Sequence, residues 1–194
     1  ALCPELDIHW IDAALVARAR HLSQQAREPV AWYEHRLLGY NHRMSNLVAA
    51  VGLAQVRRLT EMVARRRAIF GWYRERLAGE GAISLMPQAP YGEVSRWLTV
   101  ICFDRDPSDN PDGATPGATS ERVRLALEAA NIESRPLWKP MHLQPVFRGA
   151  TTYGGAIAHD LFTRGLCLPS GATMTAGDCD EVCEIILRTL NTTH

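Results

Sequence analysis

The feature that most constrains the fold is a long helical pattern in the first half of the chain. Between Asn46 and about Leu77, apolar side chains recur at helical spacing. The apolar positions are Leu47, Val51, Ala54, Leu59, Met62, Val63, Phe70, Tyr73 and Leu77, and we expect Arg57, Arg58, Arg65, Arg66 and Arg74 on the solvated side. Ser45 stands where an N-cap is needed, and Gly79 and Gly81 end the pattern.

The segments after this pattern predict a small α/β unit. Val94–Phe103 is rich in β-branched and aromatic residues, as buried strands are. Shorter strands are predicted at 132–138 and 165–168, and helices at 11–26, 120–130, 158–163 and 175–190. Thr175 with Asp178 predicts a capped last helix, and 104–118 is a solvent loop rich in Asp, Pro and Gly. The expected fold class is α/β, with a small sheet flanked by helices and preceded by one long helix.

Composition excludes several classes of protein. Hydrophobic residues make up 46% of the chain and charged residues 22%, as in soluble globular proteins. Basic and acidic side chains balance at 21 each, so no net field attracts nucleic acid or anionic lipid. No apolar run is long enough to span a membrane and no signal-peptide pattern is present, so we expect a cytoplasmic protein. The five cysteines form no metal-ligand set and are expected to be buried, reduced thiols.

A single lysine limits the chemistry. Lys139 is the only lysine among the 21 basic residues, so a reaction that needs a lysine must use it or a residue outside this chain. There is no P-loop motif and no Gly-x-Gly-x-x-Gly after a strand. Leu168-Pro169-Ser170-Gly171 lacks the glycine that a serine-hydrolase elbow needs two residues before its serine, so we expect a turn at a strand end.

Three segments in order resemble one family. They are GYNHRMSNLVAAVGLAQ (39–55), SRPLWKPMHLQPVF (134–147) and GLCLPSGATMT (165–175). They are similar to the C-terminal half of the DegT/StrS-type sugar aminotransferases, which use pyridoxal 5'-phosphate (PLP), and the resemblance runs from about Asp12 to Leu190. Within the family the chain looks most like the branch that aminates C4 of UDP-linked 4-keto-6-deoxy-N-acetylhexosamines. Residues 1–10 match no part of the pattern.

The resemblance implies a fold and a function for the complete protein. Residues 39–194 would be the C-terminal small domain of a fold-type I PLP-dependent transferase with its long connecting helix, and residues 1–38 a remnant or tail of the large PLP-binding domain. Complete members transfer an amino group from glutamate to a UDP- or dTDP-linked keto sugar, for polysaccharide, glycan or secondary-metabolite biosynthesis, and form homodimers. Their cofactor-bonding lysine lies in the large domain, so no catalytic residue is assigned here.

The first segment supplies the candidate cofactor contacts. Asn41 has an amide that can donate to the PLP phosphate, and the resemblance implies that it does so across a dimer interface. Arg43 points the same way if the segment is extended, and its planar guanidinium suits an oxyanion. The structural alternatives are a turn residue at the helix entry for Asn41 and a surface ion pair for Arg43.

The second segment supplies the candidate substrate contacts. Pro136 and Pro140 fix the backbone around Trp138, Lys139 and His142. The resemblance implies that His142 contacts a sugar hydroxyl or lies beside the substrate phosphates. Trp138 forms either an apolar wall against the sugar or uracil or an anchor in the core. Lys139 is expected to meet the substrate diphosphate or solvent, and not to bond PLP.

Two other functions stay open at this point. The chain is alternatively a non-catalytic, truncated relative that acts as a dimerising or binding module, or part of a PLP-dependent sugar 3-dehydratase of the same fold. Without the large domain, the apolar side of Leu15, Leu22 and part of the long helix would be uncovered, so we expect the isolated chain not to be a monomer. No motif includes Trp32 or Trp97, and both are expected in the core.

Overall fold

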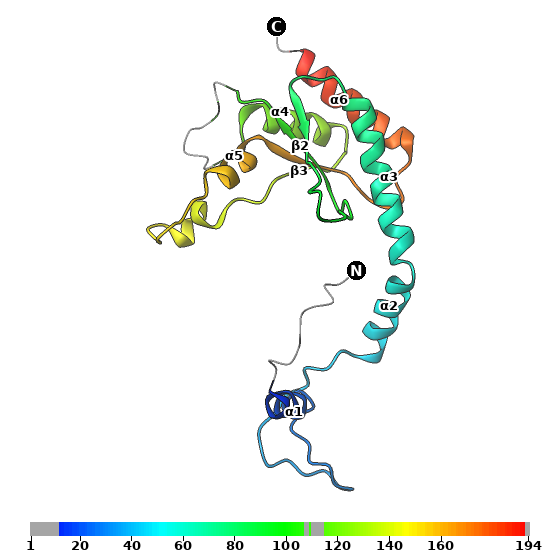
Figure 1. The fold of residues 1–194 in the computed structure, drawn as a ribbon, viewed down its shortest axis with the longest axis vertical. Coiled ribbons are helices and arrows are strands. Elements are labelled where there is room, and N and C mark those ends of the chain that lie inside the picture. Colours follow the sequence, from blue (N-terminus) through cyan, green and yellow to red (C-terminus); the bar gives the residue numbers. More distant parts are fainter. Residues whose placement is uncertain (1–11, 107–108, 110–114, 193–194) are drawn as a thin grey trace. The chain divides into compact units, whose positions relative to one another are not determined.

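The computed structural model describes residues 12–106, 109 and 115–192 (Figure 1). Residues 1–10 and part of the predicted loop at 104–118 therefore lie outside the described residues. The chain divides into two compact units, residues 1–57 and residues 58–194, which are described separately below. The division falls inside the predicted long helix.

The described part of the first unit contains two helices joined by a loop that folds back on itself. Helix α1 spans Ala13–Leu22, and the carboxylate of Asp12 caps it by accepting a hydrogen bond from a first-turn N–H (2.9 Å). In the loop, an isolated antiparallel bridge pairs Gln24 with Asn41. Helix α2 spans Asn46–Arg57.

The predicted long helix is interrupted at one residue. Helix α2 ends at Arg57, and helix α3 spans Leu59–Leu77 in the second unit. Arg58 between them has φ −100° and ψ 3°, outside helical geometry. Such a short interruption leaves the spacing of the apolar side chains almost unchanged, so the sequence pattern does not reveal it. The predicted cap at Ser45 is confirmed, because its hydroxyl accepts a hydrogen bond from an N–H of α2 (3.3 Å).

A four-stranded antiparallel sheet forms the centre of the second unit. Its strands are β1 (Ile83–Leu85), β2 (Thr99–Phe103), β3 (Arg135–Pro136) and β4 (Gly165–Leu168), in the spatial order β1-β2-β4-β3. The predicted bounds of β4 are confirmed, whereas β2 begins at Thr99 and not at Val94, and β3 covers only the middle of 132–138. The sequence did not predict β1, because three residues are too few to show an alternating pattern.

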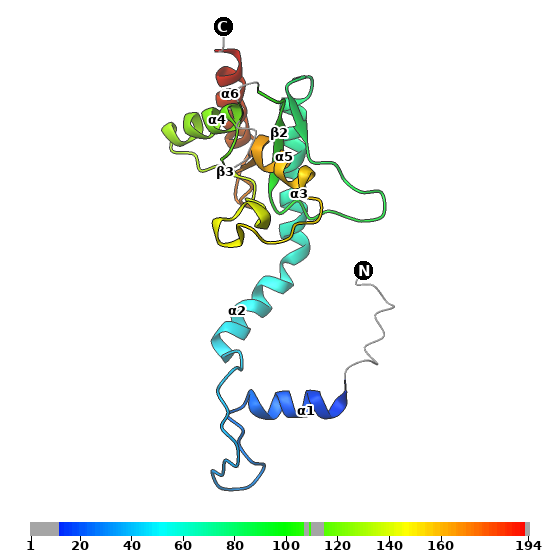
Figure 2. The same ribbon diagram turned by 90° about the vertical axis from the view of Figure 1, so that its left-hand side faces the viewer.

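Three helices cover one face of the sheet and enclose the core. They are α3, α4 (Ala118–Ala129) and α6 (Ala176–Asn191), which lie together in Figures 1 and 2. Because side chains alternate along a strand, Ile101, Phe103, Leu166 and Leu168 face these helices, and each of these side chains is at most 2% exposed. Cys167 points to the opposite face of the sheet.

The structure confirms the predicted cap of α6 and the predicted burial of three cysteines. The capping box of α6 is confirmed, because Thr175 Oγ1 accepts from the Asp178 N–H (3.3 Å) and Asp178 Oδ2 accepts from the Thr175 N–H (2.7 Å). The four described cysteines are free thiols, and Cys167, Cys179 and Cys183 are buried as predicted. The prediction was wrong for Cys102, which is only partly buried, and Cys3 lies outside the described residues. No group of residues suited to hold a metal ion occurs in the described part of the chain.

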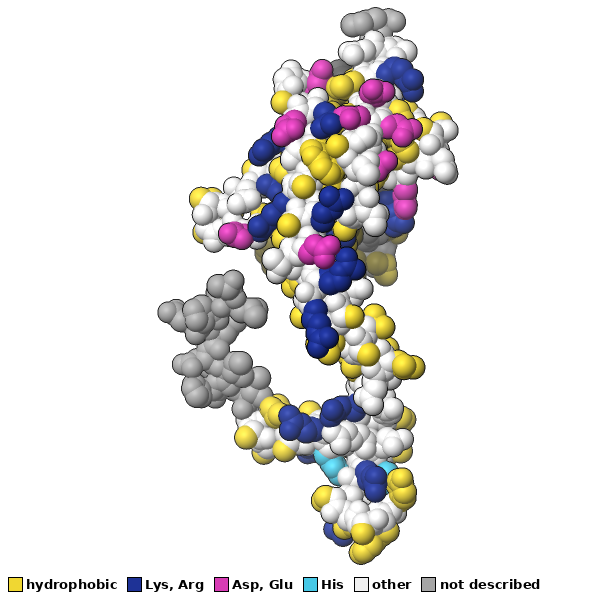
Figure 3. Space-filling view, turned by 90° about the vertical axis from the view of Figure 1, so that its right-hand side faces the viewer, with side chains coloured by type: hydrophobic (Ala, Val, Ile, Leu, Met, Phe, Trp, Pro, Cys, Tyr) yellow, Lys and Arg dark blue, Asp and Glu magenta, His cyan; other side chains and the backbone are white. Residues whose placement is uncertain are grey.

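Large apolar side chains lie uncovered along the first unit. No residue of α1 or α2 is buried, and Leu15 is 62% exposed, as expected for the chain by itself (Figure 3). The placement of Trp32 and Trp97 in the core was wrong, because these side chains are 63% and 61% exposed. Among the described helices, none has the length and apolar character to cross a membrane.

Candidate functional site

The segment before Asn41 packs closely against the loop that follows α1. A β-carbon on Gly39 would come within 2.5 Å of the main-chain nitrogen of Ala26, so only glycine fits there without a shift of the backbone. On the next residue, the carbonyl oxygen of Tyr40 accepts a hydrogen bond from the Gln25 N–H (3.1 Å). The Gly-Tyr-Asn segment is therefore held against the loop that follows α1, and Asn41 stands at its exposed end.

Asn41 and Arg43 line the same hollow of about 740 Å³ in the first unit. Its other lining residues are Gln24, Gln25, Arg27, Glu28, Pro29, Val30, Met44 and Asn46. The Oδ1 atom of Asn41 accepts a hydrogen bond from the Arg43 N–H (3.1 Å), so the segment bends at this point instead of extending. This is the turn that was the structural alternative for Asn41, and it uses only the oxygen of the amide.

The donors of this pair are available for a ligand. Among the described residues, neither the Asn41 NH2 group nor the Arg43 guanidinium has a hydrogen-bond or ion-pair partner. The surface ion pair that was the alternative for Arg43 is therefore not formed within the described part. A neutral amide donor and a guanidinium on one rim suit the oxygens of a phosphate, which makes the pair chemically compatible with the phosphate of PLP.

Trp138 lies in the second unit and contacts a residue that the sequence did not connect with it. Its ring and that of Trp97 have centroids 5.9 Å apart and planes tilted by 33°, and the two side chains are 65% and 61% exposed. They line a hollow of about 390 Å³ on the face of the sheet opposite the core. The remaining lining residues are Leu98, Glu133, Ser134, Arg135, Pro136, Cys167, Leu168, Pro169 and Ser170. The side chain of Trp138 is therefore exposed and is not an anchor in the core.

The exposure of Trp97 has a local cause. The residue before it, Arg96, has a left-handed backbone (φ 53°) and is only 7% exposed. Its guanidinium lies over the ring of Phe70 (3.8 Å to the centroid) and donates to the carbonyl of Met86 (2.9 Å). Arg96 therefore occupies the buried position at this corner, and Trp97 points outward.

Two arginines expected on the solvated side of the long helix bind the loops around this hollow. Arg66 donates from one nitrogen to the main-chain oxygens of both Trp97 and Ser170 (3.2 Å to Ser170). Arg65 donates to the carbonyl oxygens of Ala172 (3.3 Å) and Met174 (3.2 Å). The sequence pattern missed this role because the acceptors lie far away along the chain.

His142 lies in a separate hollow of the second unit. It belongs to the 3-10 helix Met141–Leu143, and it lines a space of about 300 Å³ with Met141 and residues 147 and 150–153. The ring lies against the main chain of Gly155, the residue before helix α5 (Ala156–Arg164). Lys139 is half-buried and lines neither this hollow nor that of Trp138. The structure thus separates the three substrate-side candidates.

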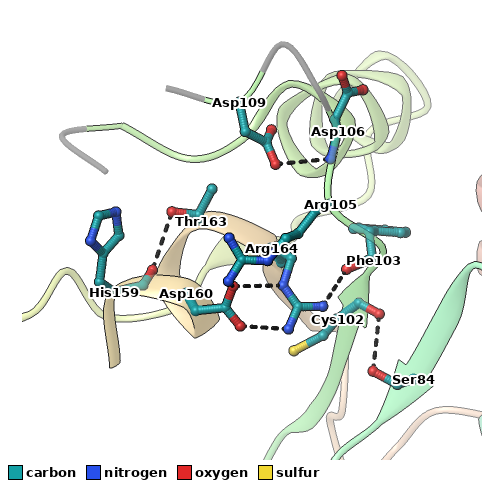
Figure 4. Close-up of polar contacts among 10 residues, drawn as sticks. All are labelled: Ser84, Cys102, Phe103, Arg105, Asp106, Asp109, His159, Asp160, Thr163 and Arg164. Atoms are coloured by element: carbon teal, nitrogen blue, oxygen red, sulfur yellow. Dashed lines mark hydrogen bonds and ion pairs between the residues drawn. The ribbon is translucent and has the colours of Figure 1, made fainter. Parts of the chain in front are cut away.

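A further group of charged residues joins α5 to the end of β2 (Figure 4). Arg164 binds Asp160 through two nitrogens (2.6 and 3.1 Å) and donates to the carbonyl of Phe103 (2.7 Å), while Arg105 contacts the same carboxylate (2.5 Å). The hydrogen bonds from Arg164 lower the pKa of Asp160. Because both arginines are paired with this carboxylate, we interpret the group as a structural ion-pair network.

The comparisons with known proteins agree with the fold and the segments. The model of the DegT/DnrJ/EryC1/StrS aminotransferase family matches residues 8–187, and the chain belongs to this family.

Relatives and a solved structure cover nearly the whole chain. EpsN of Bacillus subtilis, whose name places it among pyridoxal phosphate-dependent aminotransferases, is 40% identical over 93% of this chain and 45% of its own length. The GDP-perosamine synthase of Caulobacter vibrioides is 34% identical over 88% of this chain and 44% of its own length. The aminotransferase TlmJ from Streptoalloteichus hindustanus has the same fold (TM-score 0.74, 23% identity) over 93% of this chain and 46% of that one. The chain thus spans about half the length of the curated relatives it matches.

Proposed function

We propose that this chain is the C-terminal part of a PLP-dependent aminotransferase that transfers the amino group of glutamate to C4 of a nucleotide-linked 4-keto-6-deoxy sugar. The observation that carries the proposal is the pair of donors on Asn41 and Arg43, in one hollow of a chain that belongs to this family. In this assignment residues 39–194 form the small domain, and residues 1–38 are the tail of the large domain.

The residues of the chain would hold and orient the cofactor. When bound, PLP supplies the electron sink for the movement of the amino group. Asn41 and Arg43 would hold its phosphate through charge-assisted hydrogen bonds. Lys139 lies in the second segment, away from this pair in sequence, so we propose that the lysine which bonds PLP belongs to the half of the protein that this chain does not span.

The second segment would bind the sugar nucleotide. His142, with its ring against Gly155, can exchange a hydrogen bond with a sugar hydroxyl, and Lys139 can meet the diphosphate. Trp138 would form an apolar wall. We expect a UDP- or dTDP-linked sugar, and the GDP in the name of the perosamine synthase is a reason to test all three nucleotides.

We propose a cytoplasmic homodimer as the working form. In it, Asn41 and Arg43 of one subunit would serve the cofactor of the other. The uncovered apolar side chains of α2, such as Leu47 (82% exposed) and Val56 (66% exposed), support the burial of this helix in a larger assembly. Sedimentation of the complete protein tests this, and a monodisperse monomer would contradict it.

Substitution of Asn41 separates its turn from its donor role. Asn41→Ala removes both, whereas Asn41→Asp keeps the oxygen that accepts from the Arg43 N–H and replaces the NH2 donor with a negative oxygen. A hydrogen bond to a charged group contributes about 1.5–3 kcal/mol, so both variants should weaken the binding of pyridoxamine phosphate to the complete protein by about 10- to 100-fold. Titration calorimetry measures this affinity.

The controls distinguish the possible outcomes. Arg36→Ala, which alters an exposed arginine of the same unit outside the hollow, should leave the affinity unchanged. Full affinity in Asn41→Asp would mean that Asn41 serves only the turn. Mass spectrometry of the product from glutamate and a nucleotide-linked 4-keto sugar then tests the reaction. A product that has lost its C3 hydroxyl and gained no amino group would indicate a dehydratase, and no cofactor binding would indicate a non-catalytic module.

A further inference from the structure

We propose that the hollow between Trp97 and Trp138 binds the nucleobase of the sugar nucleotide by stacking. This inference rests on the proposed function for the presence of a nucleotide, and it adds Trp97 and the position of the base. Each indole is more than half exposed to water. Because burial of a large apolar ring is favourable, a ligand that covers these two rings would gain binding free energy. Together the two tilted rings form one bent aromatic surface inside a concavity.

The size and lining of the hollow fit one aromatic ring of a ligand. Its volume of about 390 Å³ lies at the lower end of the range for small-molecule sites, about 300–1,000 Å³. Pro136 and Pro169 add rigid apolar walls. Glu133 and Arg135 stand at the rim and are paired with each other, because two guanidinium nitrogens donate to the Oε1 atom of Glu133. The atoms outside this pair, Oε2 of Glu133 and Nη1 of Arg135, can accept from ring N–H groups and donate to ring carbonyls. A purine or a pyrimidine presents groups of both kinds.

The main chain under Trp97 is held in place before any ligand arrives. Arg66 donates to the carbonyl oxygens of both Trp97 and Ser170. Trp97 precedes β2 and Ser170 follows β4, so this arginine joins the chain at the start of one strand to the chain at the end of the other. The buried Ser170 hydroxyl accepts from the Thr99 N–H (2.8 Å) and donates to the Leu168 carbonyl (3.0 Å). The platform therefore needs little ordering on binding, which favours affinity.

Stacking would also let the hollow accept different bases, with the polar contacts at its rim as an addition. Each nucleobase has a flat π face, so stacking on aromatic side chains tolerates different bases. A sugar ring has no such face, and its many hydroxyls would need more polar partners than the rim offers. We therefore favour the base over the sugar as the occupant.

Titration calorimetry with small probes tests the proposal directly. The probes are UMP and GMP, which carry a base, and N-acetylglucosamine 1-phosphate, which carries none. Trp97→Ala and Trp138→Ala should each weaken UMP and GMP binding by about 5- to 100-fold, as expected for the loss of one stacking partner. They should leave the sugar phosphate unchanged. Trp97→Phe should keep most of the affinity, and Tyr91→Ala, which removes a 92% exposed aromatic ring elsewhere in this unit, should have no effect.

Arg66 is tested as a positioning residue. Arg66→Gln should weaken UMP binding and also change the near-ultraviolet circular dichroism of the tryptophan pair, since the coupling of two indoles depends on their geometry. A loss of affinity with an unchanged spectrum would show that Arg66 does not position Trp97.

The remaining outcomes overturn the proposal. It fails if UMP does not bind the unsubstituted protein, if both tryptophan variants bind UMP normally, or if they lose the sugar phosphate equally. Because these measurements need no turnover, they are independent of the reaction. Amino transfer with an unchanged KM in both variants would refute the base site alone, while UMP binding at the pair without amino transfer would refute only the proposed reaction.

Discussion

Replacement of Gly155 with alanine tests whether the main chain before α5 holds the ring of His142. A β-carbon at residue 155 would stand 2.7 Å from Cε1, 3.1 Å from Nε2 and 3.2 Å from Nδ1 of this ring. Carbon atoms in contact are about 3.5–4.0 Å apart, so the ring must move. Gly155 also has φ 101°, a conformation that costs a residue with a side chain about 1–3 kcal/mol.

The neighbouring glycine provides a matched control. Gly154 also has a positive φ (71°), but a β-carbon there would meet nothing within 4 Å. Gly154→Ala and Gly155→Ala both add backbone strain, and only Gly155→Ala adds the clash. The ring of His142 is half-buried and can turn aside, and a side chain forced off its rotamer costs about 0.5–1.5 kcal/mol, so Gly155→Ala should lower the free energy of unfolding by about that much more than Gly154→Ala.

Urea unfolding of the single variants and of a double variant measures the effect. His142→Ala removes the ring, so Gly155→Ala should cost less in that background, with a coupling energy of about 0.5–1.5 kcal/mol. Equal losses for the two glycine variants, together with no coupling to His142, would refute the idea that Gly155 sets the position of the ring.

Two further predictions concern the packing of the second unit. Because hydrogen bonds from Arg164 lower the pKa of Asp160, their stabilisation is present above the unfolded-state pKa of about 3.9 and is lost as the pH falls through the lower folded-state pKa. Asp160→Asn should cost about 1 kcal/mol near neutral pH and flatten the slope of unfolding free energy below about pH 4 in urea titrations, and an unchanged slope would contradict this. Tyr73→Phe removes the hydrogen bond from a fully buried hydroxyl to the Pro169 carbonyl (3.0 Å) and should cost about 1 kcal/mol. Tyr91→Phe on the surface should cost nothing in the same experiment, and equal losses would exclude a contribution from the bond.

The elements that were predicted correctly depend on neighbours in sequence. Strand β4 keeps its predicted bounds because its short apolar run is bounded by Gly165 and Pro169. The cap of α6 joins Thr175 to Asp178 within one helical turn. The helical pattern after Ser45 is likewise a local signal, although the interruption at Arg58 is too short to disturb it.

The candidate site was only partly accessible from the sequence. The family segments pointed to Asn41, Arg43, Trp138, Lys139 and His142, and the cofactor and substrate roles of these residues stay predictions. The bend that joins Asn41 to Arg43 was foreseen only as an alternative, because an amide oxygen can satisfy either a ligand or its own backbone.

The sequence by itself determined the family, the helical and strand segments with strong local patterns, and the residue types available for chemistry. Only the tertiary structure decided that Arg96 is buried and Trp97 exposed, that Arg66 binds two distant carbonyl groups, and that the ring of His142 lies against Gly155. The physical reason is that burial and hydrogen bonding depend on which segments meet in space. A left-handed residue or a carbonyl about a hundred positions away leaves no trace in the local spacing of apolar and polar side chains.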